Sequence, residues 1–456
     1  MTIREILEAQ SHFFAEGGTR PVAVRRQYLR KLLEEICSRE KDICRALHED
    51  LHKTEFESRS TEIGLIKNEL STMIRKLGSY TRPRRVKVAA INLPASGMLY
   101  PEPFGKVLIF SAWNYPFQLM VSPFIGAIAA GNCTILKPAE QAAATADVIA
   151  EIVEAVFPPE YAAVCRGGHE VTRELLAEEF DYIFYTGGTA GGKLVARSAA
   201  EHFTPTTLEL GGKNPCIVDD DAKIDLAAKR IVWGKFLNAG QTCCAPDYIL
   251  AHRSLRDALI ERMKHWITAF YGDDPRISPD FPRIISSHHC ERLAGLMNGS
   301  EILCGGTVSI EERYVAPTIL VPASNDAPVM GEEIFGPLLP VLTVDSPDEA
   351  VAFVAKRPKP LALYYFSNGR KHLDSVLAMT SSGGVCVNET IMHFINPDMP
   401  FGGVGASGHG AYHGKRSFDT FTHYKPVMLK SNLIDLPTRY PPNLDGKLKM
   451  LDMMGM

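Results

Sequence analysis

The chain of 456 residues lacks the signatures of several large classes of protein. Its 49 Lys and Arg do not exceed its 53 Asp and Glu, and the formal charge of −4 leaves no basic footprint. Nucleic acid and acidic membrane surfaces are therefore not expected as partners. Its 10 cysteines include no Cys-x-x-Cys pair, which argues against a disulfide framework and favours a reduced, cytoplasmic protein.

Membrane-directing segments are scarce as well. The N-terminal sequence MTIREILEAQ has no basic region followed by an apolar one, and Glu5 and Glu8 argue against a transit peptide. The most apolar region, residues 116–131, is shorter than the roughly 20 residues of a spanning helix. No transmembrane segment is expected, although the methionine-rich residues 450–456 are compatible with peripheral membrane contact.

Two glycine-rich motifs approach nucleotide-binding signatures but miss a required part. GGTAGGK, residues 187–193, has Leu194 where a P-loop needs Ser or Thr to bind magnesium. It still offers a strand, a glycine turn and a helix start, which suit a phosphate-bearing ligand. GVGASG, residues 403–408, has no strand before it and no apolar helix after it, so it is predicted to be a loop. His409 and His413 have no further ligand beside them, so no metal site is predicted.

What the sequence does contain is an alternation of short apolar runs and helical patterns. Residues 3–77 have the apolar spacing of helices, and residues 82–103 are rich in prolines and β-branched residues, which indicates an extended arm or hairpin. The rest of the chain alternates strand and helix patterns, which predicts βαβ units and parallel sheets, an α/β fold class. Ligands of such sheets bind at the carboxyl ends of strands, where Lys137 and Glu209 are expected.

The expected strands fall into two runs separated by the glycine turn LGGKNP, which alone would be compatible with a plain connection between domains. The first run contains KVLIFS, CTILK, AAVCRGG, YIFYTGG and TTLELGG. The second contains PCIVDD, DYILA, APTIL, LLPVLTV, LALYYFS and GGVCVNE. Helices are expected over residues 116–130 and 225–237 and from Lys193 onward, and a turn over residues 345–348.

NAGQTCCAPD, residues 238–247, places two cysteines side by side. In an extended stretch successive side chains point to opposite sides, so one thiol should face a cleft and the other the packed interior. Cys244 precedes the strand DYILA and is predicted to be core, whereas Cys243 is the better-exposed candidate nucleophile. A cysteine in a loop is more often structural, so the pattern alone leaves both roles open.

Six motifs, spread in order over most of the chain, resemble the aldehyde dehydrogenase superfamily. They are SAWNYPF around Asn114, ILKPAE around Lys137, TLELGGKNP around Glu209, GQTC around Cys243, EEIFGP around Glu333 and PFGGVGASG near Phe401. The segments LYPEPFGKV, IFYTG, CCAPDYIL, YHGKRSFDTFTH and RYPP are similar to the class 3 branch, the fatty and aromatic aldehyde dehydrogenases.

The resemblance implies a Rossmann-like parallel-sheet cofactor domain, a second α/β catalytic domain and a small β oligomerisation arm. The cofactor domain would take residues 1–81 and 104–210, and the catalytic domain residues 211–405. The arm would take residues 82–103 and 419–433 and reach a partner subunit in a homodimer, and residues 434–456 would form a C-terminal tail.

The resemblance also implies a reaction, the NAD(P)-dependent oxidation of an aldehyde to a carboxylic acid. Cys243 matches the nucleophile that attacks the carbonyl carbon. Asn114, with the backbone N–H of Cys243, matches the oxyanion site. Glu209 matches the general base that activates water to hydrolyse the thioester.

NAD is the implied cofactor, with NADP possible in the class 3 branch. Lys137 and Glu140 match residues that hold the adenosine ribose, and a carboxylate there favours an unphosphorylated 2′-hydroxyl. Glu333 and Phe335 match residues that place the nicotinamide ribose and ring.

The phosphate-binding turn is expected at Gly187, Gly188 and Gly192. Many relatives have Ser or Asn where this chain has Gly188, so one side-chain contact to phosphate is missing. A backbone N–H would compensate for it.

The entrance to the substrate pocket is expected to be mostly apolar or aromatic. This composition suits a medium- or long-chain aliphatic aldehyde or an aromatic one. His413 is equally compatible with a role in capping a turn. The residues expected there are Tyr115, Ile391, Phe394 and His413.

Two alternative functions use the same residues. A cofactor-free thiol hydrolase or acyltransferase would use Cys243 with a histidine base, but the motif supplies a glutamate. A catalytically silent structural protein is disfavoured because Cys243, Glu209 and Asn114 are all present. Reduction of NAD or NADP by a panel of aldehydes distinguishes the three.

Overall fold

The computed structural model describes residues 1–435, 440–442 and 445–453 and contains two compact units. The larger unit comprises Met1–Tyr80 and Pro103–Thr422, and the smaller one comprises Thr81–Glu102 and the chain from His423 onward. Parts of the expected tail and its methionine-rich end, residues 436–439, 443–444 and 454–456, lie outside the described residues.

A six-stranded sheet in the larger unit has the strand order β17–β7–β6–β3–β4–β5. Its five parallel strands are β3 (Lys106–Phe110), β4 (Cys133–Lys137), β5 (Ala162–Val164), β6 (Tyr182–Gly187) and β7 (Thr206–Leu210). The short strand β17 (Gly408–His409) returns from far along the chain and pairs antiparallel with β7, with Gly408 opposite Glu209. The prediction of a loop was therefore wrong at the end of GVGASG, because β7 supplies the partner backbone.

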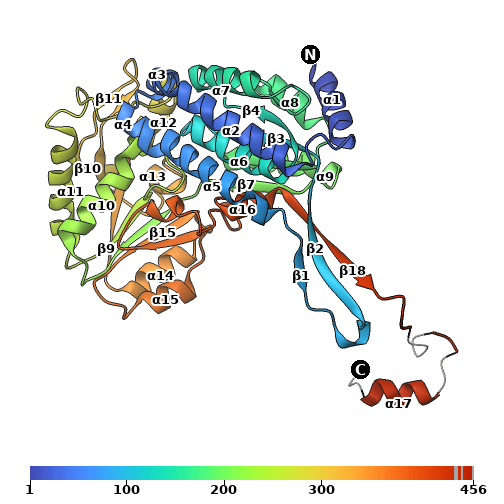
Figure 1. Ribbon diagram of the computed structural model, residues 1–456. Helices are drawn as coiled ribbons and strands as arrows, with labels where there is room; N and C mark the ends of the chain where they lie inside the picture. Colours follow the sequence, from blue (N-terminus) through green and yellow to red (C-terminus); the bar gives the residue numbers. More distant parts are fainter. Residues whose placement is uncertain (436–439, 443–444, 454–456) are drawn as a thin grey trace. The chain divides into compact units, whose positions relative to one another are not determined.

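Helices cover both faces of this sheet because alternate residues of the central strand β3 face opposite sides. Val107 and Ile109 share a core with α2 (Val22–Ser38), α5 (Gly64–Tyr80), α6 (Pro116–Ala130) and α7 (Ala143–Val156). Leu108 and Phe110 share another with α1 (Ile3–Ala15), α8 (His169–Leu176) and α9 (Thr189–Glu201). Figure 1 shows this layering. α3 (Glu40–Leu51), α4 (Glu55–Ser58) and the π-helical turn η1 (Arg59–Ile63) join α2 to α5.

A seven-stranded sheet, also in the larger unit, has the order β10–β13–β14–β9–β8–β15–β16. All neighbouring strands are parallel except β10 and β13. The strands are β8 (Pro215–Val218), β9 (Tyr248–His252), β10 (Ser300–Cys304), β13 (Thr318–Pro322), β14 (Leu338–Val344), β15 (Ala362–Phe366) and β16 (Gly384–Val387). β11 (Val308–Ser309) and β12 (Tyr314–Val315) form a separate two-stranded ribbon.

Helices also connect the strands of this second sheet. The expected turn at residues 345–348 is only partly present, because Ser346 caps a helix whose first residue is Pro347. The helices are α10 (Ile224–Phe236), α11 (Arg256–Tyr271), α12 (Ser287–Leu296), α13 (Pro328–Gly331), α14 (Pro347–Ala355), α15 (Leu373–Met379) and α16 (Lys415–Thr420), with short 3-10 turns η3 (Leu237–Gly240) and η4 (Met392–Ile395).

The smaller unit is built on a three-stranded sheet with the order β1–β2–β18. Residues 82–103 are extended as predicted, since β1 (Arg84–Val86) and β2 (Ala95–Pro103) form an antiparallel pair in which Arg84 faces Leu99. The third strand, β18 (Thr422–Lys430), begins after α16, so residues 419–421 precede the strand. The 3-10 turn η2 (Ala90–Asn92) and the helix α17 (Asp445–Met453) complete the elements of this unit.

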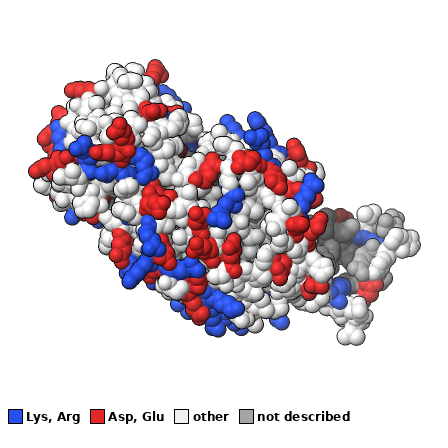
Figure 2. Space-filling view, turned by 90° about the horizontal axis from the view of Figure 1, so that it is seen from above, with Lys and Arg blue, Asp and Glu red and all other residues white. Residues whose placement is uncertain are grey.

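Surface charge and helix hydropathy agree with the composition. Figure 2 shows acidic and basic side chains interspersed over the face that it draws, as a formal charge of −4 allows. Among the helices of the described residues, none combines the length and apolar character needed to cross a bilayer.

Candidate active site

A cavity of about 760 Å³ lies in the larger unit at the carboxyl ends of β3, β4, β6 and β7. Parallel α/β sheets bind ligands at this edge. The cavity brings together nine of the residues predicted from the sequence, namely Asn114, Lys137, Glu140, Gly187, Gly188, Glu209, Cys243, Glu333 and Phe335.

The two adjacent cysteines have different surroundings, as predicted. Cys243 lines the cavity, whereas Cys244 is only 3% exposed and belongs to the core. Asn214, which the sequence analysis missed, holds the loop: its Nδ2 donates to the backbone oxygens of Cys243 at 2.7 Å and Ala245 at 2.9 Å. Its Oδ1 accepts from Ala362 N at 2.8 Å, so one side chain ties the cysteine loop to β15. The sequence feature that could have identified Asn214 is its position in the motif LGGKNP.

The Asn114 amide is oriented by the same loop. Its Nδ2 donates to Gln241 O at 3.0 Å, and its Oδ1 is buried without a hydrogen-bond partner among the described residues. A primary amide carries two N–H groups, so one donor remains for a ligand. The backbone oxygen of Asn114 accepts from Lys53 Nζ at 3.0 Å and Asn238 Nδ2 at 2.7 Å.

Glu209 occupies an apolar environment. It is 4% exposed, and neither carboxyl oxygen has a hydrogen-bond partner in the described part of the chain. Burial, with a smaller contribution from Cys243, raises the pKa of Glu209 well above its ordinary value. Hydrogen bonding to the Cys244 thiol, together with burial, raises the pKa of Cys243 as well. Both groups therefore ionise less readily than they would in water.

The cavity fits a dinucleotide along its first-sheet wall. The helix α9 starts there with Gly188 at its N-cap, and no described side chain caps it, so its free N–H groups suit a phosphate. A β-carbon on Gly188 would meet no described atom within 4 Å, which leaves room for a ligand. Burial lowers the pKa of Lys137, whose Nζ donates to Pro138 O at 3.0 Å.

Gly192 does not line the cavity. A β-carbon on this residue would lie 2.7 Å from Leu210 Cδ2, so the glycine allows α9 to pack closely on β7. The sequence analysis predicted that Gly187, Gly188 and Gly192 all belong to the phosphate-binding turn, but only the first two line the cavity. The helix begins at Thr189 rather than near Lys193 because the helical turn starts directly after Gly188.

Glu333 and Phe335 line the same cavity from the loop between α13 and β14. Burial and the nearby Asp247 carboxylate raise the pKa of Glu333 to about 8. Asp247 Oδ2 accepts from Ile334 N at 2.8 Å, and Arg292 Nη2 donates to Ile334 O at 2.5 Å, so the backbone between the two residues is fixed from both sides. Sequence reasoning missed Asp247 and Arg292 because they act through backbone contacts rather than through a motif.

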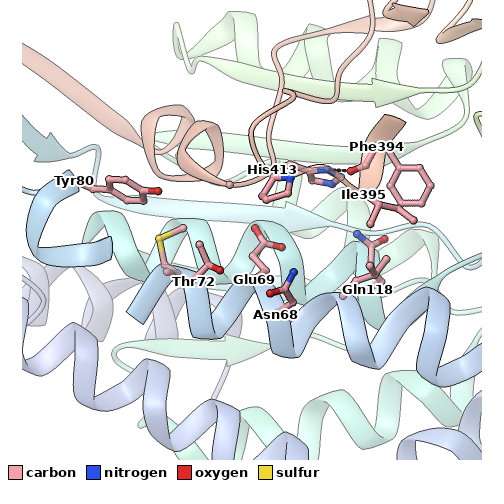
Figure 3. A pocket seen from close by; sticks show the side chains of 12 residues that line it. Asn68, Glu69, Thr72, Tyr80, Gln118, Phe394, Ile395 and His413 are labelled. Carbon is pink, nitrogen blue, oxygen red and sulfur yellow. Dashed lines mark hydrogen bonds between the residues drawn. The ribbon is translucent and has the colours of Figure 1, made fainter. Parts of the chain in front are cut away.

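The four residues expected in the substrate pocket do not line this cavity. Phe394 and His413 line a smaller one, with Glu69, Gln118 and Tyr80 (Figure 3). His413 Nδ1 is 2.8 Å from Phe394 O, and its Nε2 is buried without a partner among the described residues. Burial lowers the pKa of His413 to about 4, so the imidazole is neutral near pH 7.

The other two residues of that prediction are buried elsewhere. The Tyr115 hydroxyl lies 2.7 Å from Thr242 Oγ1, next to the reactive loop, and Ile391 is 2% exposed with a φ of 50°. The first turn of α6 lies between the two cavities, since Gln118 lines the smaller one and Leu119 the larger one.

The cavity at the carboxyl edge of this parallel sheet brings together a thiol from the loop before β9, an amide donor and a buried carboxyl, which suits an enzyme that binds a nucleotide and uses a cysteine nucleophile. The model of the aldehyde dehydrogenase family matches residues 2–427, and the chain belongs to this family.

Similar proteins cover the chain almost completely. Aldehyde dehydrogenase family 3 member A2 of Pongo abelii is 45% identical over 450 residues, 98% of this chain and 92% of the relative. The dimeric NADP-preferring aldehyde dehydrogenase of Canis lupus familiaris is 45% identical over 444 residues, 97% and 98% of the two chains. A solved structure described as the substrate-bound state of Staphylococcus aureus AldH has a TM-score of 0.97, 43% identity and full coverage of both chains.

These likenesses confirm the α/β fold class and the resemblance to the class 3 branch. The protein is an NAD(P)-dependent aldehyde dehydrogenase, which oxidises aldehydes to carboxylic acids.

Proposed function

We propose that Cys243, Asn114 and Glu209 carry out this oxidation. The observation that supports the proposal is that all three line one cavity at the edge of the first sheet, where the thiol contributes to the raised pKa of the carboxyl.

In the first half-reaction, Cys243 Sγ gives its proton to solvent and attacks the aldehyde carbon, and the C=O π electrons move to the oxygen, which forms the thiohemiacetal oxyanion. The negative charge that develops on the carbonyl oxygen is stabilised by the free N–H of the Asn114 amide and the backbone N–H of Cys243. A nicotinamide cofactor bound beside Glu333 and Phe335 would supply the hydride acceptor, and Cys243 would hold the resulting acyl group as a thioester.

In the second half-reaction, ionised Glu209 removes a proton from water, which attacks the thioester. The acid is released, the thiolate of Cys243 leaves, and Glu209 passes its proton to solvent. The apolar surroundings of Glu209 make its ionised form a stronger base than a solvated carboxylate.

The cofactor is proposed to lie along the first-sheet wall. Lys137 and Glu140 would hold the adenosine ribose, and the start of α9 at Gly187 and Gly188 would hold the phosphates. Glu333 and Phe335 would hold the nicotinamide end. The Glu140 carboxylate favours NAD, and the NADP preference named for the dog relative supports NADP as an alternative.

The substrate is proposed to be a medium- or long-chain aliphatic aldehyde or an aromatic one. The smaller cavity at Phe394 and His413 would receive the substrate's tail, because it lies on the other side of the first turn of α6 from the cofactor cavity. The neutral His413 imidazole is compatible with such an apolar tail.

The domain roles follow from the same proposal. Residues 1–81 and 104–210 would bind the dinucleotide, and residues 211–405 would supply the nucleophile. Residues 82–103 and 419–433 would join two subunits into a homodimer, which the word dimeric in the dog relative's name supports. We place the protein in the cytoplasm on its thiol content, since all ten cysteines are free.

The test is the reduction of NAD and NADP by a panel of aldehydes, followed at the absorbance of the reduced cofactor. Cys243→Ser should lower turnover by roughly 10³-fold or more, because a hydroxyl is a far weaker nucleophile. Cys244→Ser, the matched control, should keep most of the activity because its side chain lies in the core. Equal losses in both variants would contradict the assignment, and ester hydrolysis without any aldehyde oxidation would favour the thiol hydrolase.

A further inference from the structure

A fully buried ion pair lies behind the active site, outside the residues that line either cavity. Lys53 Nζ and Glu62 Oε1 are 2.6 Å apart, and both side chains are 0% exposed. Burying two charges costs about as much as their attraction returns, so such a pair is weak evidence for stability by itself. The contacts made by its remaining donors and acceptors indicate another role.

Both members of the pair bind the backbone around Asn114. Lys53 Nζ donates to Asn114 O at 3.0 Å. Glu62 Oε2 accepts from Phe117 N at 2.9 Å and Gln118 N at 3.1 Å, the first free N–H groups of α6. The chain is therefore held at Asn114 itself and again three and four residues later.

The Lys53 ammonium group also contacts Tyr115, which lies between Asn114 and Phe117 in the sequence. Lys53 Nζ lies 4.0 Å from the centre of the Tyr115 ring, within the range of a cation–π interaction. Tyr115 in turn contacts Thr242, the residue before the nucleophile. Lys53 therefore contacts Asn114 directly, and it is linked to the residue before Cys243 through Tyr115.

Asn238 links residues 114–118, the segment bound by Lys53 and Glu62, to the loop that carries Cys243. Its Nδ2 donates to Asn114 O at 2.7 Å and to Gln241 O at 3.1 Å, and Gln241 O also accepts from Asn114 Nδ2. The backbone N–H of Asn238, which has a φ of 53°, donates to Glu57 Oε1 at 3.0 Å. Asn114 O is thus shared by Lys53 and Asn238, and the direction of its side-chain amide is set by the loop that carries Cys243.

We propose that Lys53 and Glu62 are positioning residues for the oxyanion donor. They fix the backbone of Asn114 so that the free N–H of its amide meets the oxygen of a carbonyl bonded to Cys243. The inference rests on the proposed roles of Asn114 and Cys243. Misplacement of a donor by about 1 Å costs on the order of 10²-fold in rate, so loss of the pair acts on the transition state rather than on substrate binding.

Two reagents that modify Cys243 separate this role from a purely structural one. 4-Nitrophenyl acetate transfers its acetyl group to Sγ through a tetrahedral oxyanion and releases nitrophenolate. Iodoacetamide alkylates Sγ by displacing iodide at a saturated carbon, with no oxyanion. In both reactions the thiol proton goes to solvent, no cofactor is needed, and mass spectrometry of the Cys243 peptide gives both rates.

Lys53→Met is expected to slow acetylation by about 10- to 100-fold relative to alkylation. Asn114→Ala should also lower the ratio of the acetylation rate to the alkylation rate. The double variant should have the same ratio as Asn114→Ala alone, because both substitutions act on the same N–H donor. Lys53→Arg should recover part of the ratio, and Glu62→Gln should lower it. Lys67→Met removes an ion pair with Glu40 in the same helical region and should leave the ratio unchanged.

An unchanged ratio in Lys53→Met and Glu62→Gln would overturn the positioning role, as would additive losses in the double variant. If Lys53→Met does not fold, Lys53→Arg and Glu62→Gln decide by the same ratio. Failure of the proposed function is a different result: aldehyde oxidation would then survive in Cys243→Ser, whatever the ratio.

Discussion

At the scale of the residue, the protein environment makes both reacting groups harder to ionise. Burial raises the pKa of Glu209, and hydrogen bonding to Cys244 with burial raises that of Cys243. A raised pKa means that the protonated form persists to higher pH, so each group ionises less readily than in water. The same environment makes each ionised group more reactive, because a base or thiolate of higher pKa binds a proton or carbon more strongly.

The pH dependence of thioester hydrolysis should report the ionisation of Glu209. Below its raised pKa, the rate should increase about tenfold per pH unit, because only the ionised carboxyl accepts a proton from water. Glu209→Gln should form about one reduced cofactor per site and then stall at every pH. Stopped-flow absorbance between pH 6 and 9 measures both the burst and the steady rate. Sustained turnover of Glu209→Gln at the original rate would exclude Glu209 as the base.

Single residues could be predicted only where they act through their own side chain within a motif. Asn114, Glu209 and Cys243 each stand in a contiguous motif, and the cavity brings them together. Lys53 and Asn238 act on the backbone oxygen of Asn114 from positions 61 and 124 residues away in the sequence. No local pattern reports such a contact, because only the folded backbone brings the partners within reach.

At the scale of the element, strand patterns were predictable where apolar residues run without interruption. β4 and β14 coincide with the runs CTILK and LLPVLTV, because strands covered on both faces are apolar throughout. β17 has two residues, a glycine and a histidine, and exists because β7 offers it a backbone partner. The start of α9 was placed too late, because its glycines lower helix propensity while the turn geometry fixes its first residue.

Gly188→Ser should improve the start of α9. The backbone of Gly188, with φ −72° and ψ 156°, suits a serine N-cap, and no described atom lies within 4 Å of the new β-carbon. We expect a gain of about 0.3 kcal/mol in the free energy of unfolding. The cofactor should bind roughly 2- to 10-fold more tightly if the hydroxyl meets a phosphate. Thermal unfolding and cofactor titration measure the two effects.

Gly192→Ser in the same helix is the matched control. Its β-carbon would lie 2.7 Å from Leu210 Cδ2, and overpacking of this kind costs about 1–3 kcal/mol. A stabilised Gly192→Ser would contradict the packing role of Gly192, and weaker cofactor binding by Gly188→Ser would contradict the proposed placement of the phosphates.

At the scale of the whole molecule, the smaller unit exposes more apolar surface than a solitary sheet of three strands would be expected to keep in water. Val86 on β1, Tyr100 on β2, and Met428 and Leu429 on β18 are all 40% or more exposed. An interface with a second copy of the chain would cover such a surface.

The protein should therefore have a mass in solution of about twice 50.3 kDa, measured by light scattering after size exclusion. Met428→Lys should shift it toward the monomer, because a charge at the interface opposes association. Leu226→Lys, an exposed apolar position on α10, is the control and should leave the mass unchanged. A monomeric wild type at micromolar concentration would rule out the homodimer.

Because β17 pairs with β7, the edge of β7 stays open during synthesis until β17 has been translated. β7 ends at Leu210, but the strand that closes its open edge ends at His409, so about 200 residues must be translated in between. At roughly 5–20 residues per second, this edge, which carries Glu209, stays unpaired for roughly 10–40 s on the ribosome. Open strand edges recruit other strands, so the nascent chain has a long interval in which a chaperone that shields this edge would raise the yield of active enzyme.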